Sequence, residues 1–92
     1  MSIHRFAAKR DANESDLFHV AEQLAAVLVR APPLDAWSYY RGLWVPVEVK
    51  NPEGLNRYTR AQERFIQLCA IAGAPMFTWR TSSDVLRDLG AK

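Results

Sequence analysis

The sequence predicts a mixed α/β domain in which one small β-sheet is flanked by helices. Apolar residues recur with helical spacing over residues 13–29 and again over 59–72. Between these segments, residues 34–40 and 43–50 alternate apolar and polar side chains around a central Arg-Gly pair, as expected for a β-hairpin. A short strand and a short helix follow the second helical segment. The predicted order is α-β-β-α-β-α, within one domain that spans the whole chain, residues 1–92.

The composition is that of an ordinary globular protein, with 49% hydrophobic and 24% charged residues. No segment resembles a transmembrane helix or a secretory signal. Cys69 is the only cysteine, which excludes an internal disulfide and a cysteine-based zinc cluster and favours a cytoplasmic location. Nine of the twelve basic residues are arginine, which suits phosphate recognition, although codon bias also explains such an excess.

The first helical segment, residues 13–29, has its apolar side chains on one stripe. Asp11 or Asn13 is a suitable N-cap, and the segment ends at "APPL", residues 31–34, because proline cannot continue a helix. Residues 1–10 read as a basic N-terminal arm. The stripe consists of Leu17, Ala21, Leu24, Ala25 and Leu28.

Turn and cap residues define the second half of the chain. Residues 51–58, "NPEGLNRY", are typical of a loop. Thr59 and Gln62 have the spacing of a capping box at the start of the second helix, and Gly73 is suited to its end. Residues 75–80 then predict a strand. A last helix is expected from Ser82 or Ser83 to Gly90.

A tight turn of even length at Arg41-Gly42 places Asp35 directly across from Glu48. In this register residues 40 and 43 pair, and Cβ atoms of facing residues are roughly 5 Å apart. The opposite face of the hairpin then collects the small and branched apolar side chains, which favours the register. An odd-length turn would break this pairing, and Arg41 is not an ideal residue for the required turn.

Two facing carboxylates repel each other unless a positive charge lies nearby. Lys50 shares a face with Glu48 and supplies one such charge. A divalent Mg²⁺ or Mn²⁺ ion would compensate better, since it prefers oxygen ligands and completes its shell with water and substrate phosphates. The set Asp35, Glu48 and Lys50 therefore fits metal-assisted phosphodiester hydrolysis. A Glu-x-Lys strand is also common as an ordinary solvated face.

Two further polar residues allow two interpretations each. Glu14 lies on the core-facing line of the first helix, where it either interacts with the helix dipole or points into the same site and holds a metal-bound water. Gln62 either completes the capping box or contacts the site or a phosphate with its amide.

Arginines near the second helix form a candidate DNA-binding face. Arg57 precedes this helix, and Arg60 and Arg64 lie four residues apart on one side of it. Arg41, in the hairpin turn, is a further candidate. Contacts of this kind are largely independent of base sequence. A solvated charged face is the alternative, because Glu63 lies among these residues.

In combination, these motifs resemble the PD-(D/E)XK nuclease core and, more narrowly, the small virus-type replication-repair nuclease (VRR-NUC) group. The resemblance covers about residues 9–89. It departs from the family pattern at Leu34, where a proline is expected, and at Pro46, which removes a backbone donor and suggests an edge or a bulge. The segments that carry it are "KRDANE" (9–14), "LDAWSYYRG" (34–42), "VPVEVK" (45–50), "YTRAQERF" (58–65) and "PMFTWRTSSDVLRDL" (75–89).

The resemblance implies a restriction-endonuclease-like core and a specific role for each matching residue. Asp35, Glu48 and the backbone carbonyl of Val49 would be metal ligands, and Lys50 would be the catalytic lysine. Glu14 would be the helix carboxylate near the metal, and Gln62 would open the helix after the active strand.

The function implied is that of a Mg²⁺- or Mn²⁺-dependent, structure-selective DNA endonuclease that acts in DNA repair. The expected substrate is branched DNA such as a Holliday junction, and the expected assembly is a homodimer without a membrane partner. The alternatives are a non-catalytic nucleic-acid-binding domain on the same fold and a protein-interaction module. Trp37 and Trp44 share the face of the charged residues, where they line a cleft or meet a partner.

Overall fold

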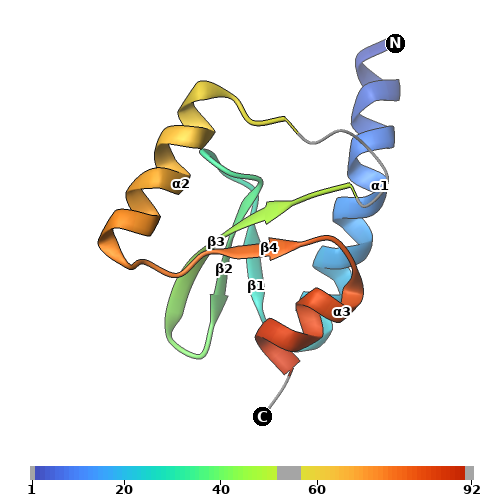
Figure 1. Ribbon diagram of the computed structural model, residues 1–92. Helices are drawn as coiled ribbons and strands as arrows, with labels where there is room; N and C mark the ends of the chain where they lie inside the picture. The colour runs from blue at the N-terminus through green and yellow to red at the C-terminus, as the bar shows by residue number, and fades with distance from the viewer. Residues whose placement is uncertain (1, 52–56, 91–92) are drawn as a thin grey trace.

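The computed structural model describes residues 2–51 and 57–90, with side chains described from residue 13 onward. The described residues form three helices, a π-helical turn η1 and four strands (Figure 1). Their bounds, in chain order, are α1 Ser2–Gln23, β1 Val27–Val29, β2 Ala36–Tyr40, β3 Leu43–Val49, α2 Arg60–Ala72, β4 Phe77–Trp79, α3 Ser82–Val85 and η1 Leu86–Gly90.

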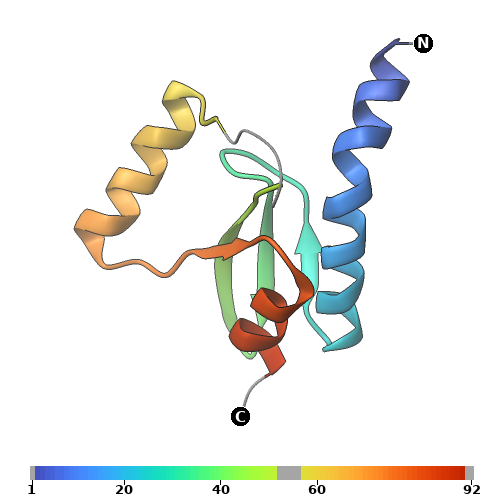
Figure 2. The ribbon, with the colours of Figure 1, turned by 45° about the vertical axis from the view of Figure 1, so that its right-hand side comes forward.

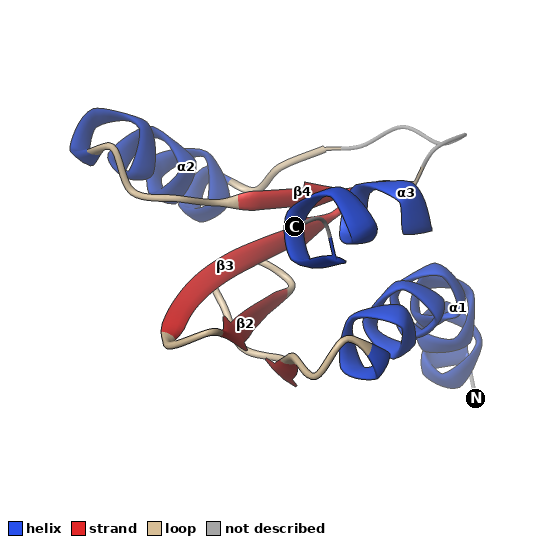
Figure 3. Cartoon of the chain, turned by 90° about the horizontal axis from the view of Figure 1, so that it is seen from below, coloured by secondary structure: helices blue, strands red, loops and turns tan. Residues whose placement is uncertain are grey.

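The four strands form one mixed sheet in the order β1-β2-β3-β4. The first three strands are antiparallel, and β4 runs parallel to β3 because α2 provides the crossover between them. Helices α1 and α2 lie on opposite sides of the sheet (Figure 2). Seen from below, α3 lies on the same side of the molecule as α1, beyond β4 (Figure 3). The prediction of a small α/β domain with one flanked sheet is confirmed.

The hydrophobic core fills the space between the sheet, α1 and α3. Trp79 on β4 is its largest fully buried side chain, and its indole Nε1 donates a 2.9 Å hydrogen bond to Oδ2 of Asp88. The Phe18 ring meets the Trp79 ring edge-on at 6.4 Å between centroids. The other members of the core are Leu17, Ala21, Ala26, Ala36, Val47, Val85 and Leu89.

The first helix ends earlier than predicted, and its expected last turn is a strand. Residue Ala25 has a positive φ of 74°, and the amide of Ala26 donates to the carbonyl of Ala21. This hydrogen bond closes the helix in the manner usually associated with glycine. The helix therefore stops at Gln23, and Leu28 faces the core from β1 instead. The predicted order α-β-β-α-β-α lacked this extra strand because no glycine marks the helix end.

The start of α1 is also different from the prediction. The helix begins at Ser2, so Asp11 and Asn13 lie inside it and are not N-caps, and the expected basic arm is helical backbone. The side chain of Asn13 instead donates a 3.3 Å hydrogen bond to the backbone carbonyl of Lys50. This contact attaches α1 to the end of β3. The arm's basic side chains lie outside the described residues.

The predicted hairpin register is confirmed. Tyr40 pairs with Leu43, and Ser38 pairs with Val45. Both turn residues have positive φ, 53° at Arg41 and 85° at Gly42, as a type I′ turn requires. The non-glycine turn residue does not prevent this turn.

Pro46 lies in regular pairing with Trp37 rather than in a bulge. In a hairpin closed by a hydrogen-bonded pair, this position is a non-hydrogen-bonded pair, so the ring nitrogen of Pro46 is directed away from β2. Strand β4 joins β3 only from Val47 onward. Pro46, which has no amide donor, therefore lies where no strand of the described residues pairs with that side of β3. The predicted edge position of Pro46 is confirmed.

Both predicted ends of α2 are confirmed. The amide of Gln62 donates to Thr59 Oγ1, the amide of Thr59 donates to Gln62 Oε1, and Gly73 ends the helix with φ 70°. The last helix differs from the prediction in its cap. Thr81 precedes it, and Oδ2 of Asp84 accepts from the amides of Arg80 and Thr81 at 2.7 and 3.2 Å. The predicted loop 51–58 lies mostly outside the described residues.

Candidate functional site

Asp35 and Glu48 meet at one end of the sheet. Asp35 lies immediately before β2, and its amide donates to the carbonyl of Val47 at 3.0 Å. Its carboxylate Oδ2 accepts a 2.7 Å hydrogen bond from the amide of Val49. The carboxylate is therefore fixed against the strand that carries Glu48, and the two acidic side chains interact. The register of β2 and β3 ends at Ala36 and Val47, so the predicted direct pairing of Asp35 with Glu48 is not part of the ladder.

Glu48 is buried, with 6% of its surface exposed, and its pKa is raised from 4.5 to about 7. Burial is the largest cause of the raised pKa, followed by the negative charge of Asp35 and a hydrogen bond between the two side chains. Lys50 lowers this pKa, and Glu14 raises it slightly. The four groups are therefore close enough to form one electrostatic unit.

Contacts hold both the backbone and the side chain of Lys50. Its backbone amide donates to the carbonyl of Trp79 at 3.0 Å, which joins β3 to β4. Its ammonium Nζ lies 4.3 Å from the centre of the Tyr58 ring. A cation over an aromatic face is stabilised by the ring quadrupole. Tyr58 thus positions the ammonium that partly offsets the acidic pair.

Glu14 is buried on α1, with 6% of its surface exposed. The helix starts twelve residues earlier, so Glu14 is not in its first turn and the interpretation as a dipole partner is wrong. Its charge acts on Glu48, as expected for a side chain near the acidic pair. The hydrogen bond from the Asn13 side chain to the carbonyl of Lys50 holds this part of α1 beside the end of β3.

Gln62 and the arginines are less closely connected to the pair. The side-chain oxygen of Gln62 is used by the capping box, as one of the two interpretations predicted. Arg57, Arg60 and Arg64 are exposed near the start of α2. Arg41 lies in the hairpin turn with its guanidinium 5.1 Å from the Tyr40 ring. Because Glu48 is five residue steps along β3 from Leu43, the Arg41 backbone is roughly 17 Å or more away from the pair.

The donor set suits a hard divalent cation. Oε1 of Glu48 is buried and accepts no hydrogen bond from any residue that the structure describes. A buried carboxylate oxygen without a donor is costly unless a cation or a proton satisfies it. Within the described part of the chain, no three His, Cys, Asp or Glu side chains form a metal-binding group. A cation would therefore rest on Asp35 and Glu48, with backbone and water oxygens completing its shell.

Two residues that support the site were not predicted to do so. Tyr58 and Asn13 were assigned to a loop and to a helix cap, and their contacts with Lys50 depend on tertiary structure. The hydrogen-bonding capacity of asparagine was the only local signal.

The comparisons with protein-family models, with curated proteins and with solved structures found no match for this chain. No helix in the described part of the chain is long and apolar enough to span a membrane.

Proposed function

We propose that this protein is a metal-dependent, structure-selective DNA endonuclease with a restriction-endonuclease-like core of the VRR-NUC type. The observation that carries the proposal is the buried Glu48 in contact with Asp35 and beside Lys50, with one Glu48 oxygen lacking a donor. Burying the Glu48 carboxyl beside a second acid costs stability, and a group whose pKa is perturbed in this way is typical of a functional site. The resemblance of the sequence motifs to this nuclease group supports the same assignment.

In this proposal, Asp35 and Glu48 hold Mg²⁺ or Mn²⁺, with the carbonyl of Val49 as a third ligand. The ion, when bound, activates water and neutralises charge on the phosphate. Lys50 stabilises the negative charge that develops in the transition state. The hydrogen bond from the Val49 amide keeps Asp35 in position. Glu14 holds a water at the side of the pair that faces α1, and Gln62 fixes the start of α2.

The surface near α2 supports a DNA substrate. Arg57, Arg60 and Arg64 are exposed where α2 begins, and Lys50 is linked to the same segment through Tyr58. Phosphates bind such arginines and the free amides of a helix start. Branched DNA such as a Holliday junction, cut by a homodimer with two symmetric sites, is the substrate that we propose.

The experiment is cleavage of labelled four-way junction, flap and linear duplex DNA with Mg²⁺, with Mn²⁺ and with chelator. Lys50→Ala and Asp35→Asn should reduce cleavage at least a hundredfold, and Asp16→Asn, which changes an exposed carboxylate on α1, should not. Paired symmetric cuts in the junction would support the dimer. Tight junction binding without cleavage in either metal would favour a non-catalytic DNA-binding domain instead.

A protein-interaction module is the second candidate, because aromatic side chains are exposed on the sheet. Trp44 is 49% exposed, and its ring lies 5.1 Å from the Tyr39 ring. On β1, the exposed Val27 pairs with Tyr39, and the exposed Val29 pairs with Trp37. Large exposed aromatics are typical of interfaces. Loss of cellular function in Trp44→Ala but not in Lys50→Ala would favour this candidate over the nuclease.

A further inference from the structure

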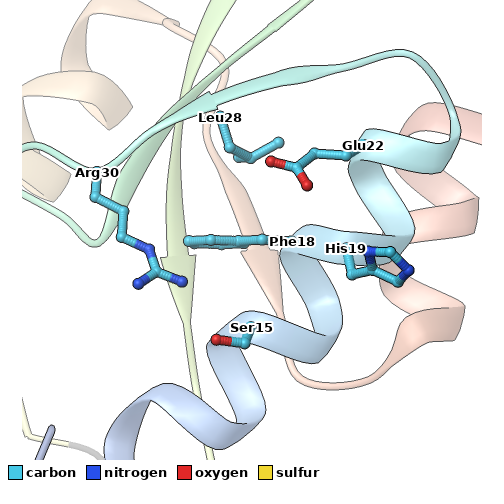
Figure 4. A pocket seen from close by; sticks show the side chains of 6 residues that line it. All are labelled: Ser15, Phe18, His19, Glu22, Leu28 and Arg30. Atoms are coloured by element: carbon cyan, nitrogen blue, oxygen red, sulfur yellow. The ribbon is translucent and has the colours of Figure 1, made fainter.

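A pocket of about 370 Å³ lies between α1 and the edge strand β1 (Figure 4). Phe18 forms its floor, with the ring buried to 4% exposure, and Leu28 adds a second apolar wall. Polar groups line the rest of the pocket: Ser15, His19 and Glu22 from α1 and Arg30 from the end of β1. Its volume is in the range of small-ligand sites, and it is an open groove because its four polar lining residues are exposed.

The two charged residues of the pocket lie on different sides of its floor. Arg30 and Ser15 are on one side of the Phe18 ring, and Glu22 and Leu28 are on the other (Figure 4). The Arg30 guanidinium is held 5.0 Å from the centre of the Phe18 ring. Among the described residues, neither Arg30 nor Glu22 forms an ion pair. The pocket therefore presents a cationic end and a separate anionic end to a ligand.

The cationic end lies at the same end of the sheet as the acidic pair. Ser15 directly follows Glu14, whose charge acts on Glu48. Arg30 directly follows β1, and Asp35 directly precedes β2, so both flank the same connection. Strands β1 and β3 are two strand spacings apart, about 10 Å. A nucleotide next to the cleaved bond can span such a distance, since phosphates along one strand are several ångströms apart.

We infer that this pocket holds one unpaired nucleotide of the DNA strand, next to the bond that the acidic pair cleaves. Its phosphate binds Arg30 and the Ser15 hydroxyl. Its base lies over the apolar wall of Leu28 and donates its exocyclic amino group to Glu22. This inference rests on the proposed function and deepens it.

The inference explains why a DNA-binding surface contains Glu22. A carboxylate repels the phosphate backbone, but it accepts a hydrogen bond from the amino group of cytosine or adenine. Unpaired thymine offers only its N3–H, which lies between two carbonyl oxygens that repel a carboxylate, so its hydrogen bond to Glu22 is weaker. Cytosine and adenine are therefore favoured over thymine at this position, by roughly threefold to tenfold for one hydrogen bond.

The test measures cleavage rates on flap and junction substrates in which each unpaired position near the cut is in turn cytosine, adenine, thymine or an abasic site. Wild type should prefer cytosine and adenine over thymine at one position. Glu22→Gln should remove this preference, because an amide both accepts and donates. Asp16→Asn, which removes one carboxylate from α1 outside the pocket, should retain it.

A second arm measures binding by anisotropy, with chelator present, to the cytosine substrate and its abasic form. Arg30→Gln should weaken binding to both, whereas Arg30→Lys should restore part of it, and thermal melting should show that the variants are folded. A wild-type enzyme that cleaves without base preference, and is unaffected by Glu22→Gln and Arg30→Gln, would overturn the pocket and leave the nuclease intact.

Two other outcomes separate the possible failures. Binding of free dCMP, detected by NMR at His19, together with indifference to base identity in the strand, would overturn the assignment to DNA. Absence of both cleavage and DNA binding in wild type would overturn the proposed function, and the pocket inference with it.

Discussion

The two faces of the sheet differ in what covers them. One face is packed against α1 and α3, and Trp79, Val47 and Ala36 there are completely buried. The other face is only partly covered by α2, through contacts such as that between the Phe65 and Trp37 rings. Exposed apolar residues remain on α2 and on this face: Val27, Val29, Tyr39, Trp44, Leu68 and Ile71. One face thus supplies stability, and the other is available for contacts.

The acidic pair lies at the boundary between these faces. Its strand neighbours belong to the covered face, whereas Lys50 is held by Tyr58 on the side of α2. A site at this boundary obtains rigidity from the core and access from the open face. This arrangement suggests that substitutions on the two faces have different effects, which the following predictions test.

The largest effect is expected at Trp79. Trp79→Ala should lower the free energy of unfolding by about 4 kcal/mol, because it leaves a cavity in the core. Trp44→Ala, on the open face, should lower it by at most about 1 kcal/mol. Urea denaturation measures both. Trp79→Phe keeps an aromatic ring and removes the hydrogen bond to Asp88. Its free energy of unfolding can be measured if the alanine variant does not fold. Similar losses for Trp79→Ala and Trp44→Ala would contradict the difference between the faces.

The next effect concerns Glu48, at the boundary between the two faces, and depends on pH. Because the pKa of Glu48 is about 7 in the fold and 4.5 ordinarily, the folded state binds more protons between these values. The free energy of unfolding should therefore fall as pH rises from about 4.5 to 7. Glu48→Gln removes this contribution and should be relatively more stable than wild type at pH 8, by roughly 1 to 3 kcal/mol.

A metal ion should reverse this pH dependence. Metal binding favours the ionised carboxylates, so Mn²⁺ should raise the melting temperature of wild type at pH 8. Asp35→Asn and Glu48→Gln should lose this increase, and Asp16→Asn should keep it. A melting temperature that is independent of Mn²⁺ at millimolar concentration would argue against the two-carboxylate metal site.

A smaller effect is expected at the start of α2. Thr59→Ala removes the side-chain acceptor for the Gln62 amide and should cost about 1 kcal/mol of stability. Gln67→Ala, at an exposed position of the same helix, should change stability by less than about 0.5 kcal/mol. Chemical denaturation of both variants checks the prediction. If the loss in Thr59→Ala does not exceed the loss in Gln67→Ala, the cap does not stabilise this sparsely packed helix.

The smallest effect is expected for the contact between Lys50 and Tyr58. A double-mutant cycle with Lys50→Met and Tyr58→Leu should give a coupling energy of about 0.5 kcal/mol, as for a partly exposed cation–π pair. A coupling energy of zero would show that Tyr58 does not position the ammonium.

Local patterns were sufficient to predict the parts of the fold that are set by turns and caps. The register of the hairpin followed from the Arg41-Gly42 turn and from the alternation of its strands, and this register brings Asp35 close to Glu48. Because the capping box at Thr59 and the αL residue Gly73 are local, α2 was predicted correctly.

Features that depend on tertiary packing could not be predicted. Ala25 ends α1 with a positive φ although it is not glycine, so β1 was read as helix. Leu28 fitted the helical stripe by coincidence, since it faces the same core from a strand. The contacts of Asn13 and Tyr58 with Lys50 join residues 37 and 8 positions away, which local periodicity does not report.

Lys50 is the point at which three distant parts of the chain converge. Its carbonyl accepts from Asn13, its amide donates to Trp79, and its ammonium lies over Tyr58. The hairpin can place Asp35 close to Glu48 by itself, but the parallel β3–β4 pairing requires closure of a long crossover loop, which is intrinsically slow. The lysine is therefore held by all three contacts only once this pairing has formed. A chain in which β4 has not yet paired with β3 therefore lacks the complete set of contacts around Lys50.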